Sequence, residues 1–167
     1  MTQAFIALGA NLPSARFGSP RQTLEAAIDA LQAHAMTVTG RSRWYESAPV
    51  PMSDQPWFVN GVIRVATDLD ADALLAVLHD TEAAFGRVRR TRWEARVVDL
   101  DLVAYGRLVR RTGSGLALPH PRMHERRFVL QPMADIDPGW RHPVLGKTVE
   151  DLLGALDTDA VVRPLEE

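Results

Sequence analysis

The 167-residue chain contains no cysteine, which excludes disulfide bonds and every reaction that needs a thiolate. It has no run of 18 apolar residues, so the sequence predicts no transmembrane helix. Residues 1–5 lack the basic start and the long apolar stretch of a secretory signal peptide. From these absences we expect a cytoplasmic protein that does not associate with a membrane.

Lysine is almost absent, because Lys147 is the only one in the chain. Nearly every cation is therefore an arginine, whose planar guanidinium binds phosphate through two hydrogen bonds. The formal net charge of −2 conceals a polarised chain, with −4 in residues 1–85, +7 in residues 86–127 and −5 in residues 128–167. The basic segment indicates a highly charged anionic partner, either a nucleic acid or a small polyphosphate.

The common nucleotide and metal motifs are missing as well. Neither Gly-x-x-x-x-Gly-Lys-Ser/Thr nor Gly-x-Gly-x-x-Gly occurs in the sequence. His120 and His124 do not have the spacing of a zinc site, and no Ser/His/Asp arrangement is recognisable. A bound phosphate would therefore have to be held by other groups.

The composition that remains is that of a globular protein. Hydrophobic residues make up 46% and charged residues 24% of the chain, which is typical of one well-packed domain over residues 1–167. Residue periodicity predicts strands at 3–8, 36–46, 57–66 and 97–105.

Two helices are predicted between these strands. Ser19 followed by Pro20 is typical of the start of the first, and Asp70 or Asp72 is expected to cap the second. The resulting order βαββαβ predicts a ferredoxin-like α+β sandwich, which helical patterns near 126–134 and 148–156 would extend at the C-terminal end.

Asp99 and Asp101 are the sharpest chemical feature of the sequence. They lie two positions apart on a predicted strand, so their side chains point the same way and their Cα atoms are about 7 Å apart. Carboxylates at that separation suit Mg²⁺, and two ions about 4 Å apart could hold a phosphoryl group during in-line transfer. The alternative is a solvated strand face that pairs with nearby arginines.

An arginine-rich segment comes directly before this pair. It contains Trp93 and the five arginines Arg87, Arg89, Arg90, Arg92 and Arg96. Cations packed this closely repel one another unless an anion lies among them, so the segment could close over a metal-bound polyphosphate and exclude water. It could also bind single-stranded nucleic acid, although the adjacent carboxylates oppose a bare phosphate backbone, or it could be a solvated loop.

Two further groups of residues could contact ligands. The segment from Pro119 to Phe128 offers phosphate donors in His120, Arg126 and Arg127. Aromatic rings and amides that could bind a flat heterocycle are spread along the chain at Asn11, Tyr45, Trp57, Phe58, Asn60, Trp93 and Phe128.

Taken in order, these segments resemble the 6-hydroxymethyl-7,8-dihydropterin pyrophosphokinase family of folate biosynthesis. The resemblance rests on ordered motifs along nearly the whole chain, namely Phe-Ile-Ala-Leu-Gly-Ala-Asn at 5–11, Tyr-Glu-Ser-Ala-Pro at 45–49, Asp-Gln-Pro-Trp-Phe-Val-Asn at 54–60, Gly-Arg-Val-Arg at 86–89, Arg-Val-Val-Asp-Leu-Asp at 96–101, and Pro-His-Pro-Arg-Met-His-Glu-Arg at 119–126. It implies a ferredoxin-like fold and transfer of the diphosphate of ATP to the hydroxymethyl oxygen of the pterin, with release of AMP. It also implies a monomer that binds ATP and pterin and no nucleic acid.

The resemblance assigns roles by position in this sequence. Asp99 and Asp101 would hold two Mg²⁺ ions, and the catalytic arginines would be Arg87, Arg89, Arg92 and Arg96. The nucleotide would be contacted by His79, Glu82, Leu102, His120 and Arg126. The pterin would lie between Phe58 and Phe128, in a pocket with Asn11, Ser47, Val50, Asn60 and Trp93.

The chain departs from the family pattern at several positions. Ala10 replaces a serine, Phe58 replaces a tyrosine, and Glu94-Ala95 replaces Gly-Pro. Residues 113–117 lack the cation and the hydroxyl that the family often has just before the Pro-His element, for which Arg110 or Arg111 could substitute. None of these changes removes a metal ligand or one of the catalytic arginines. Two other function classes stay open on the sequence alone: a nucleic-acid-binding module, and a ligand-binding domain on the same scaffold without catalysis.

Overall fold

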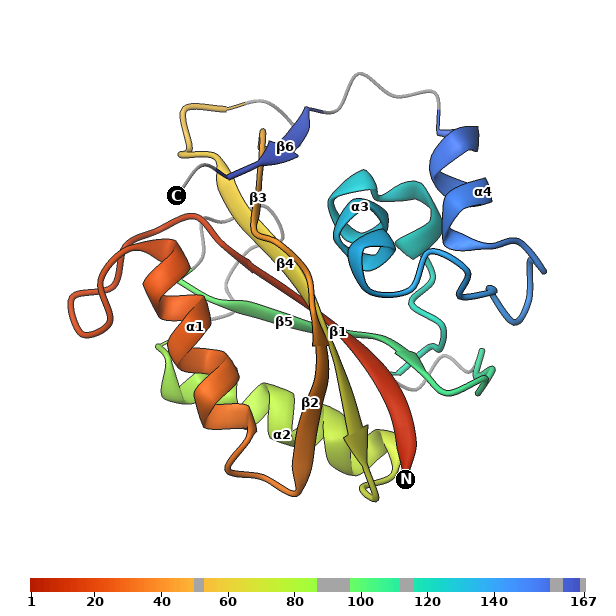
Figure 1. The fold of residues 1–167 in the computed structure, drawn as a ribbon. Helices are drawn as coiled ribbons and strands as arrows, with labels where there is room; N and C mark the ends of the chain where they lie inside the picture. Colours follow the sequence, from red (N-terminus) through yellow and green to blue (C-terminus); the bar gives the residue numbers. More distant parts are fainter. Residues whose placement is uncertain (50–52, 87–96, 112–115, 157–160, 166–167) are drawn as a thin grey trace.

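The computed structural model of the chain describes residues 1–49, 53–86, 97–111, 116–156 and 161–165. Its centre is an antiparallel sheet in the order β5-β1-β4-β3-β6, with β2 also paired to β4 (Figure 1). The strands are β1 (Thr2–Ala10), β2 (Met36–Arg41), β3 (Tyr45–Ser47), β4 (Phe58–Thr67), β5 (Asp99–Tyr105) and β6 (Val162–Pro164). The helices are α1 (Pro20–Leu31), α2 (Ala71–Ala84), α3 (Arg127–Ile136) and α4 (Val149–Ala155), with a 3₁₀ turn at Met123–Glu125.

The predicted ferredoxin-like sandwich is confirmed by the chain order of β1, α1, β2, β4, α2 and β5 and by their antiparallel pairing. The predicted single strand 36–46 is wrong, because the chain forms two short strands, β2 and β3, that both pair with β4. The break falls at Ser42, whose Oγ accepts a hydrogen bond from the Val62 N–H at 3.0 Å. Strand β6 was not predicted, and it extends the sheet beyond β3.

Helices α1, α2 and α4 begin at local capping signals, whereas α3 begins after Arg126 without a side-chain cap. Ser19 forms a capping box with Gln22 at the start of α1, and Thr148 forms one with Asp151 at the start of α4. For α2, the side chain of Asp70 accepts the hydrogen bond from the Ala73 N–H at 2.8 Å, so Asp70 is the N-cap.

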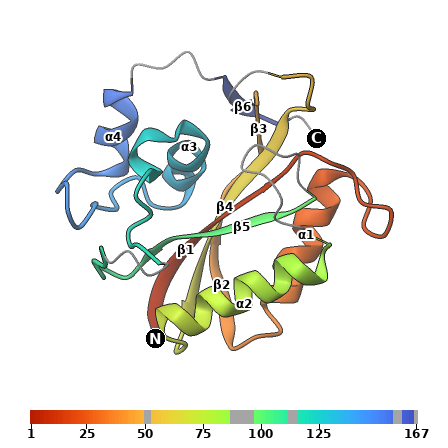
Figure 2. The same ribbon diagram turned by 180° about the vertical axis from the view of Figure 1, so that it is seen from behind.

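The two pairs of helices cover opposite faces of the sheet. Helices α1 and α2 pack on one face, and α3 and α4 pack on the other (Figures 1 and 2). Even-numbered residues of β1, such as Ile6 and Leu8, belong to the buried cluster under α1 and α2, whereas Phe5 belongs to the cluster under α3 and α4. No helix within the described ranges is long and apolar enough to cross a membrane.

Candidate active site

A row of paired residues crosses the sheet on the face that α3 covers. In the strand registers, Tyr45 of β3 pairs with Asn60 of β4, Asn60 with Gly9 of β1, and Gly9 with Asp99 of β5. Directly paired residues project from the same face, so Asn60 and Asp99 stand on either side of a residue without a side chain. A Cβ at position 9 would lie 3.1 Å from Nδ2 of Asn60. Gly9 therefore lets the Asn60 amide lie close to the strand and leaves no side chain between that amide and the Asp99 carboxylate.

Strand β5 presents Asp99 and Asp101 on the same face. Both are half-buried, whereas Leu100 between them lies in the core under α1 and α2. Val103, next in the alternation, belongs to the core under α3 and α4. The predicted alternation of this strand is confirmed, and it brings the two carboxylates to the edge strand of the α3 face.

The carboxylate pair fits a magnesium ion that also binds phosphate. Within the described residues, no cluster of three or more histidine, aspartate or glutamate side chains is arranged to hold a metal by itself. Mg²⁺ in proteins is commonly held by one or two carboxylates and completes its coordination with water and phosphate oxygens. Two half-buried aspartates on adjacent same-face positions supply that donor set, and they do not supply the closed nitrogen or sulfur cage of a structural zinc site.

His120 lies beside β5 and next to these carboxylates. Its backbone N–H donates to the Val103 carbonyl at 2.8 Å, which fixes the segment against the strand. Burial is the main reason that the pKa of His120 is lowered to about 4, and the charge of Arg126 adds to it while that of Asp99 opposes it. The imidazole is therefore neutral at pH 7.

The tautomer of His120 follows from its hydrogen bond. Its Nδ1 accepts from the Arg122 N–H at 3.1 Å, so in the neutral ring the proton is on Nε2. Arg126 follows the same segment, and its guanidinium lies 5.4 Å from the ring centre of Phe128. Asp99 comes from one predicted motif and His120 and Arg126 from another, and both Asp99 and Arg126 lie close enough to His120 to influence it electrostatically.

On the other side of Gly9, its paired residue Asn60 and the hydrogen-bond partner Ser47 are uncharged. Ser47 Oγ donates a hydrogen bond to Oδ1 of Asn60, which orients the amide across two neighbouring strands. Asn11 is almost fully buried, and its Nδ2 donates to Oε1 of Gln55 at 3.0 Å and to the Pro56 carbonyl at 3.1 Å. Asn11 therefore fixes the segment that leads into β4.

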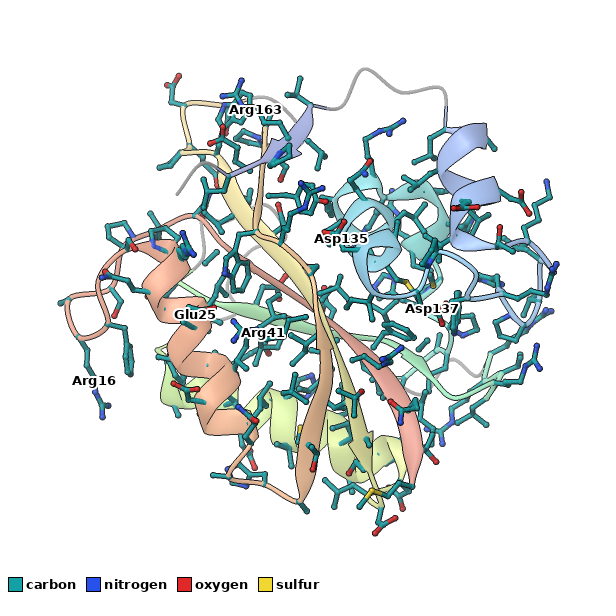
Figure 3. All side chains as sticks on the ribbon, in the orientation of Figure 1. Arg16, Glu25, Arg41, Asp135, Asp137 and Arg163 are labelled. Carbon is teal, nitrogen blue, oxygen red and sulfur yellow. The ribbon has the colours of Figure 1, made fainter. Side chains whose placement is uncertain are left out.

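The two rings expected to enclose the pterin come from different layers. Phe58 is half-buried at the start of β4, and Phe128 is half-buried in the first turn of α3. Helix α3 is tied to the sheet through Tyr45, whose hydroxyl donates to Oδ2 of Asp135 at 2.8 Å and accepts from Arg43 at 3.0 Å. Figure 3 labels Asp135 where α3 meets the strands.

The other predicted site residues lie in different surroundings. His79 is exposed on α2, and the side chain of Leu102 is buried in the core under α1 and α2, so only its backbone can face a ligand. Glu82 is 2% exposed and accepts a hydrogen bond from the Leu100 N–H at 2.8 Å. The remaining predicted residues lie outside the described part of the chain: Val50, Arg87, Arg89, Arg92, Trp93 and Arg96.

Sequence reasoning missed Asp135 and Arg163 as supports of the site. Arg163 of β6 places its guanidinium 4.6 Å from the ring centre of Trp57 and pairs with Glu46 at 2.5 Å. Figure 3 shows Arg163 beside β6, at the end of the sheet where β3 lies. No short motif links these residues, because the contacting pairs are 90 or more positions apart in the chain.

Known proteins resemble this chain in sequence along most of its length. A family model described as 7,8-dihydro-6-hydroxymethylpterin-pyrophosphokinase (HPPK) matches residues 5–138. The chain is 38% identical over 165 residues to the 2-amino-4-hydroxy-6-hydroxymethyldihydropteridine pyrophosphokinase of Methylorubrum extorquens, covering 98% of this chain and 99% of that protein. The protein of the same name from Pseudomonas aeruginosa is 37% identical over 162 residues, with 96% of each chain covered.

A solved structure shares the fold at low sequence identity. The wild-type HPPK-DHPS of Plasmodium falciparum superimposes with a TM-score of 0.73 at 13% identity, over 92% of this chain and 44% of that one. At this identity the likeness concerns the fold, whereas the family model and the near-full-length relatives concern the sequence itself. The chain belongs to the 7,8-dihydro-6-hydroxymethylpterin-pyrophosphokinase family.

Proposed function

We propose that this protein transfers the diphosphate of ATP to the hydroxymethyl oxygen of 6-hydroxymethyl-7,8-dihydropterin and releases AMP, as a step of folate biosynthesis. The observation that carries the proposal is the row Asn60–Gly9–Asp99. It places an uncharged, ring-flanked region and a carboxylate pair on one face of the sheet, about 10 Å apart across two strand spacings. A pterin alcohol and a metal-bound triphosphate can meet over Gly9.

On the phosphate side, Asp99 and Asp101 would hold magnesium, which we propose as two ions. Bound there with ATP, magnesium would offset the phosphate charge and help to align the β-phosphorus with the attacking hydroxyl. His120 offers a neutral Nε2–H as a hydrogen-bond donor, and Arg126 offers a permanent positive charge. Together they can orient the nucleotide phosphates without transferring a proton to them.

On the pterin side, Phe58 and Phe128 would enclose the ring. Asn60 would bind the heterocycle edge with its amide, whose orientation Ser47 fixes. In this placement the hydroxymethyl group would extend toward Asp99 and Asp101.

Arg87 and Arg96 are proposed to offset the charge that develops in the transition state, with Arg89 and Arg92 in the same segment. The sequence supports this role through the +7 charge of residues 86–127. The flanking structure supports it through two buried anchors. Phe85 stacks on Phe17 with ring centres 4.4 Å apart, and Val98 is fully buried just before β5.

The proposal is tested by measuring AMP release from ATP with the purified protein, with and without 6-hydroxymethyl-7,8-dihydropterin and Mg²⁺. AMP should form only when all three are present, in equal amount to the pterin diphosphate. Formation of ADP, or AMP release independent of the pterin, would refute the transfer.

We further propose that the whole chain works as a single pyrophosphokinase domain, as a monomer in the cytoplasm. In support, both helix layers of the described residues pack on a single sheet, and the sequence contains no cysteine. Light scattering of the protein with and without MgATP tests the oligomeric state.

A further inference from the structure

Glu82 is a carboxylate buried behind the candidate site. It lies near the end of α2, on the opposite side of the sheet from α3, and only 2% of its surface is exposed. Its Oε2 accepts a hydrogen bond from the backbone N–H of Leu100 at 2.8 Å, and that bond is itself buried. Leu100 is the residue between Asp99 and Asp101.

The position of β5 explains why this bond matters. Among the described strands, β5 pairs only with β1 and forms an edge of the sheet. On an edge strand, every second backbone N–H points away from its neighbour and has no partner within the sheet. Leu100 pairs in register with Leu8 of β1, and its N–H donates to the side chain of Glu82. Glu82 thus takes the place of a missing neighbouring strand.

We propose that Glu82 is a positioning residue for the carboxylate pair, acting through the Leu100 N–H and not through contact with the nucleotide. The proposal rests on the proposed function, in which Asp99 and Asp101 hold the metal. By fixing the middle residue of a three-residue segment, one buried hydrogen bond limits the movement of both flanking carboxylates. Without it, a buried N–H would lack its acceptor, and water entry or a twist of the edge strand would restore one.

Three substitutions of Glu82 test separately whether its side-chain length or its negative charge matters. Glu82→Gln keeps the length of the side chain and an oxygen acceptor but removes the charge. Glu82→Asp keeps the charge but shortens the side chain by one methylene, so it cannot reach Leu100 without a backbone shift. Glu82→Ala removes both. Thr81→Ala is the matched control, because Thr81 is buried on the same helix turn and its hydroxyl donates within the helix, to the Val77 carbonyl at 2.8 Å.

The first measurement is amide hydrogen exchange in the metal-free protein. We expect the Leu100 amide to exchange at least about tenfold faster in Glu82→Ala and Glu82→Asp, and close to the wild-type rate in Glu82→Gln and Thr81→Ala. The amide of Ile63, on strand β4 between β1 and β2, serves as the reference in each variant, so that global destabilisation is separated from a local change. An unchanged exchange rate of the Leu100 amide in folded Glu82→Asp would overturn the proposal. If Glu82→Ala does not fold, the comparison of Glu82→Asp with Glu82→Gln still decides it.

The second measurement is the Mg²⁺ concentration that gives half-maximal AMP release, together with the KM for pterin. Glu82→Asp should raise the Mg²⁺ requirement about tenfold, and Glu82→Gln and Thr81→Ala should leave it within about twofold, with the pterin KM unchanged in all of them. If Glu82→Gln were as impaired as Glu82→Ala, charge and not position would be the role of Glu82. If wild-type protein released no AMP, the proposed function would fail while the exchange result would still decide the hydrogen-bond role.

Discussion

The two sides of Gly9 are built from different chemistry. On one side, Asp99 and Asp101 lie with His120 and Arg126, so charge dominates. On the other side, Asn60 and Ser47 are uncharged and the rings of Phe58 and Phe128 are half-buried, and the nearest charge is Arg126, which lies 5.4 Å from the ring centre of Phe128. One face of one sheet therefore carries a charged group of residues and a mainly neutral one, and Gly9, which has no side chain, lies between them.

The two sides are also held in place differently. The charged side depends on backbone hydrogen bonds at the edge strand, from Leu100 to Glu82 and from His120 to the Val103 carbonyl. The neutral side depends on side-chain contacts between layers, such as Tyr45 to Asp135. Changes on the charged side should therefore act on turnover, and changes on the neutral side should act on pterin affinity.

The largest effect should come from the carboxylates. Asp99→Ala or Asp101→Ala should lower AMP release by about 1,000-fold or more, because phosphoryl transfer depends on the metal-held geometry. Pterin binding to the nucleotide-free protein, followed by fluorescence titration, should stay at the wild-type value. Asp29 is an exposed acid on α1, and the control Asp29→Asn should leave both AMP release and pterin binding unchanged. Loss of pterin binding in the carboxylate variants would show that the two sides are not separable.

The next effect should come from the ring at the start of β4. Phe58→Ala should raise the KM for pterin about tenfold, within the range measured for removal of a ring that stacks on a flat base, and leave the KM for ATP within about twofold. Phe58→Tyr keeps the stacking face and should resemble the wild type. An equal rise of both KM values in steady-state assays would contradict the division into two sides.

A smaller loss of activity is expected from a substitution of Gly9, the residue between the two sides. Gly9→Ala places a Cβ 3.1 Å from Nδ2 of Asn60, so the amide must move by a few tenths of an ångström. We expect a several-fold loss of kcat/KM for pterin, of about 1 kcal/mol. A double-mutant cycle with Asn60→Ala checks the cause, because the cost of Gly9→Ala should largely vanish when the amide is absent. If Gly9→Ala lowered kcat/KM equally in the Asn60→Ala background, the new methyl group would be acting through a residue other than Asn60.

The smallest effect concerns His142, whose titration should change the stability of the fold and not substrate binding on either side of Gly9. His142 is buried, and its Nδ1 accepts from the N–H groups of Val144 at 3.2 Å and Leu145 at 3.1 Å. Burial, and then the nearby His124, lower the pKa of His142. The unfolded chain therefore binds this proton more tightly, so the stability from neutral His142 is present above about pH 6.5 and is lost as the pH falls below it.

Thermal unfolding between pH 7.5 and 5 measures this loss. His142→Asn keeps a short acceptor near the same N–H groups and has no proton to gain, so its melting temperature should fall less steeply with acidification than that of the wild type. Identical slopes would show that His142 does not titrate differently on folding. Pterin and ATP KM values at pH 7.5 should be the same in both proteins.

Local signals in the sequence predicted much of the fold and part of the site. Ser19 was predicted as a cap, and the faces of Asp99 and Leu100 were predicted, because these depend on residues within a few positions. Asp70 and Asp72 carry the same local signal, and only the observed hydrogen bond to Ala73 distinguishes them.

Long-range features could not be predicted in this way. The break between β2 and β3 depends on how both strands register against β4. Tyr45 contacts Asp135 only because the fold brings distant segments together. The same holds for the close approach of the Asn60 amide to Gly9. The sequence placed Glu82 among ligand contacts by resemblance, and its backbone partner became visible only in three dimensions.

Strand β6 has a consequence for how relatives are compared. The family model ends at residue 138, yet β6 pairs with β3, and its Arg163 covers Trp57 next to Phe58. A substitution at Arg163 can therefore change the packing of Trp57 without changing any residue that the family model matches. A comparison limited to residues 5–138 leaves out the strand that packs beside the start of β4.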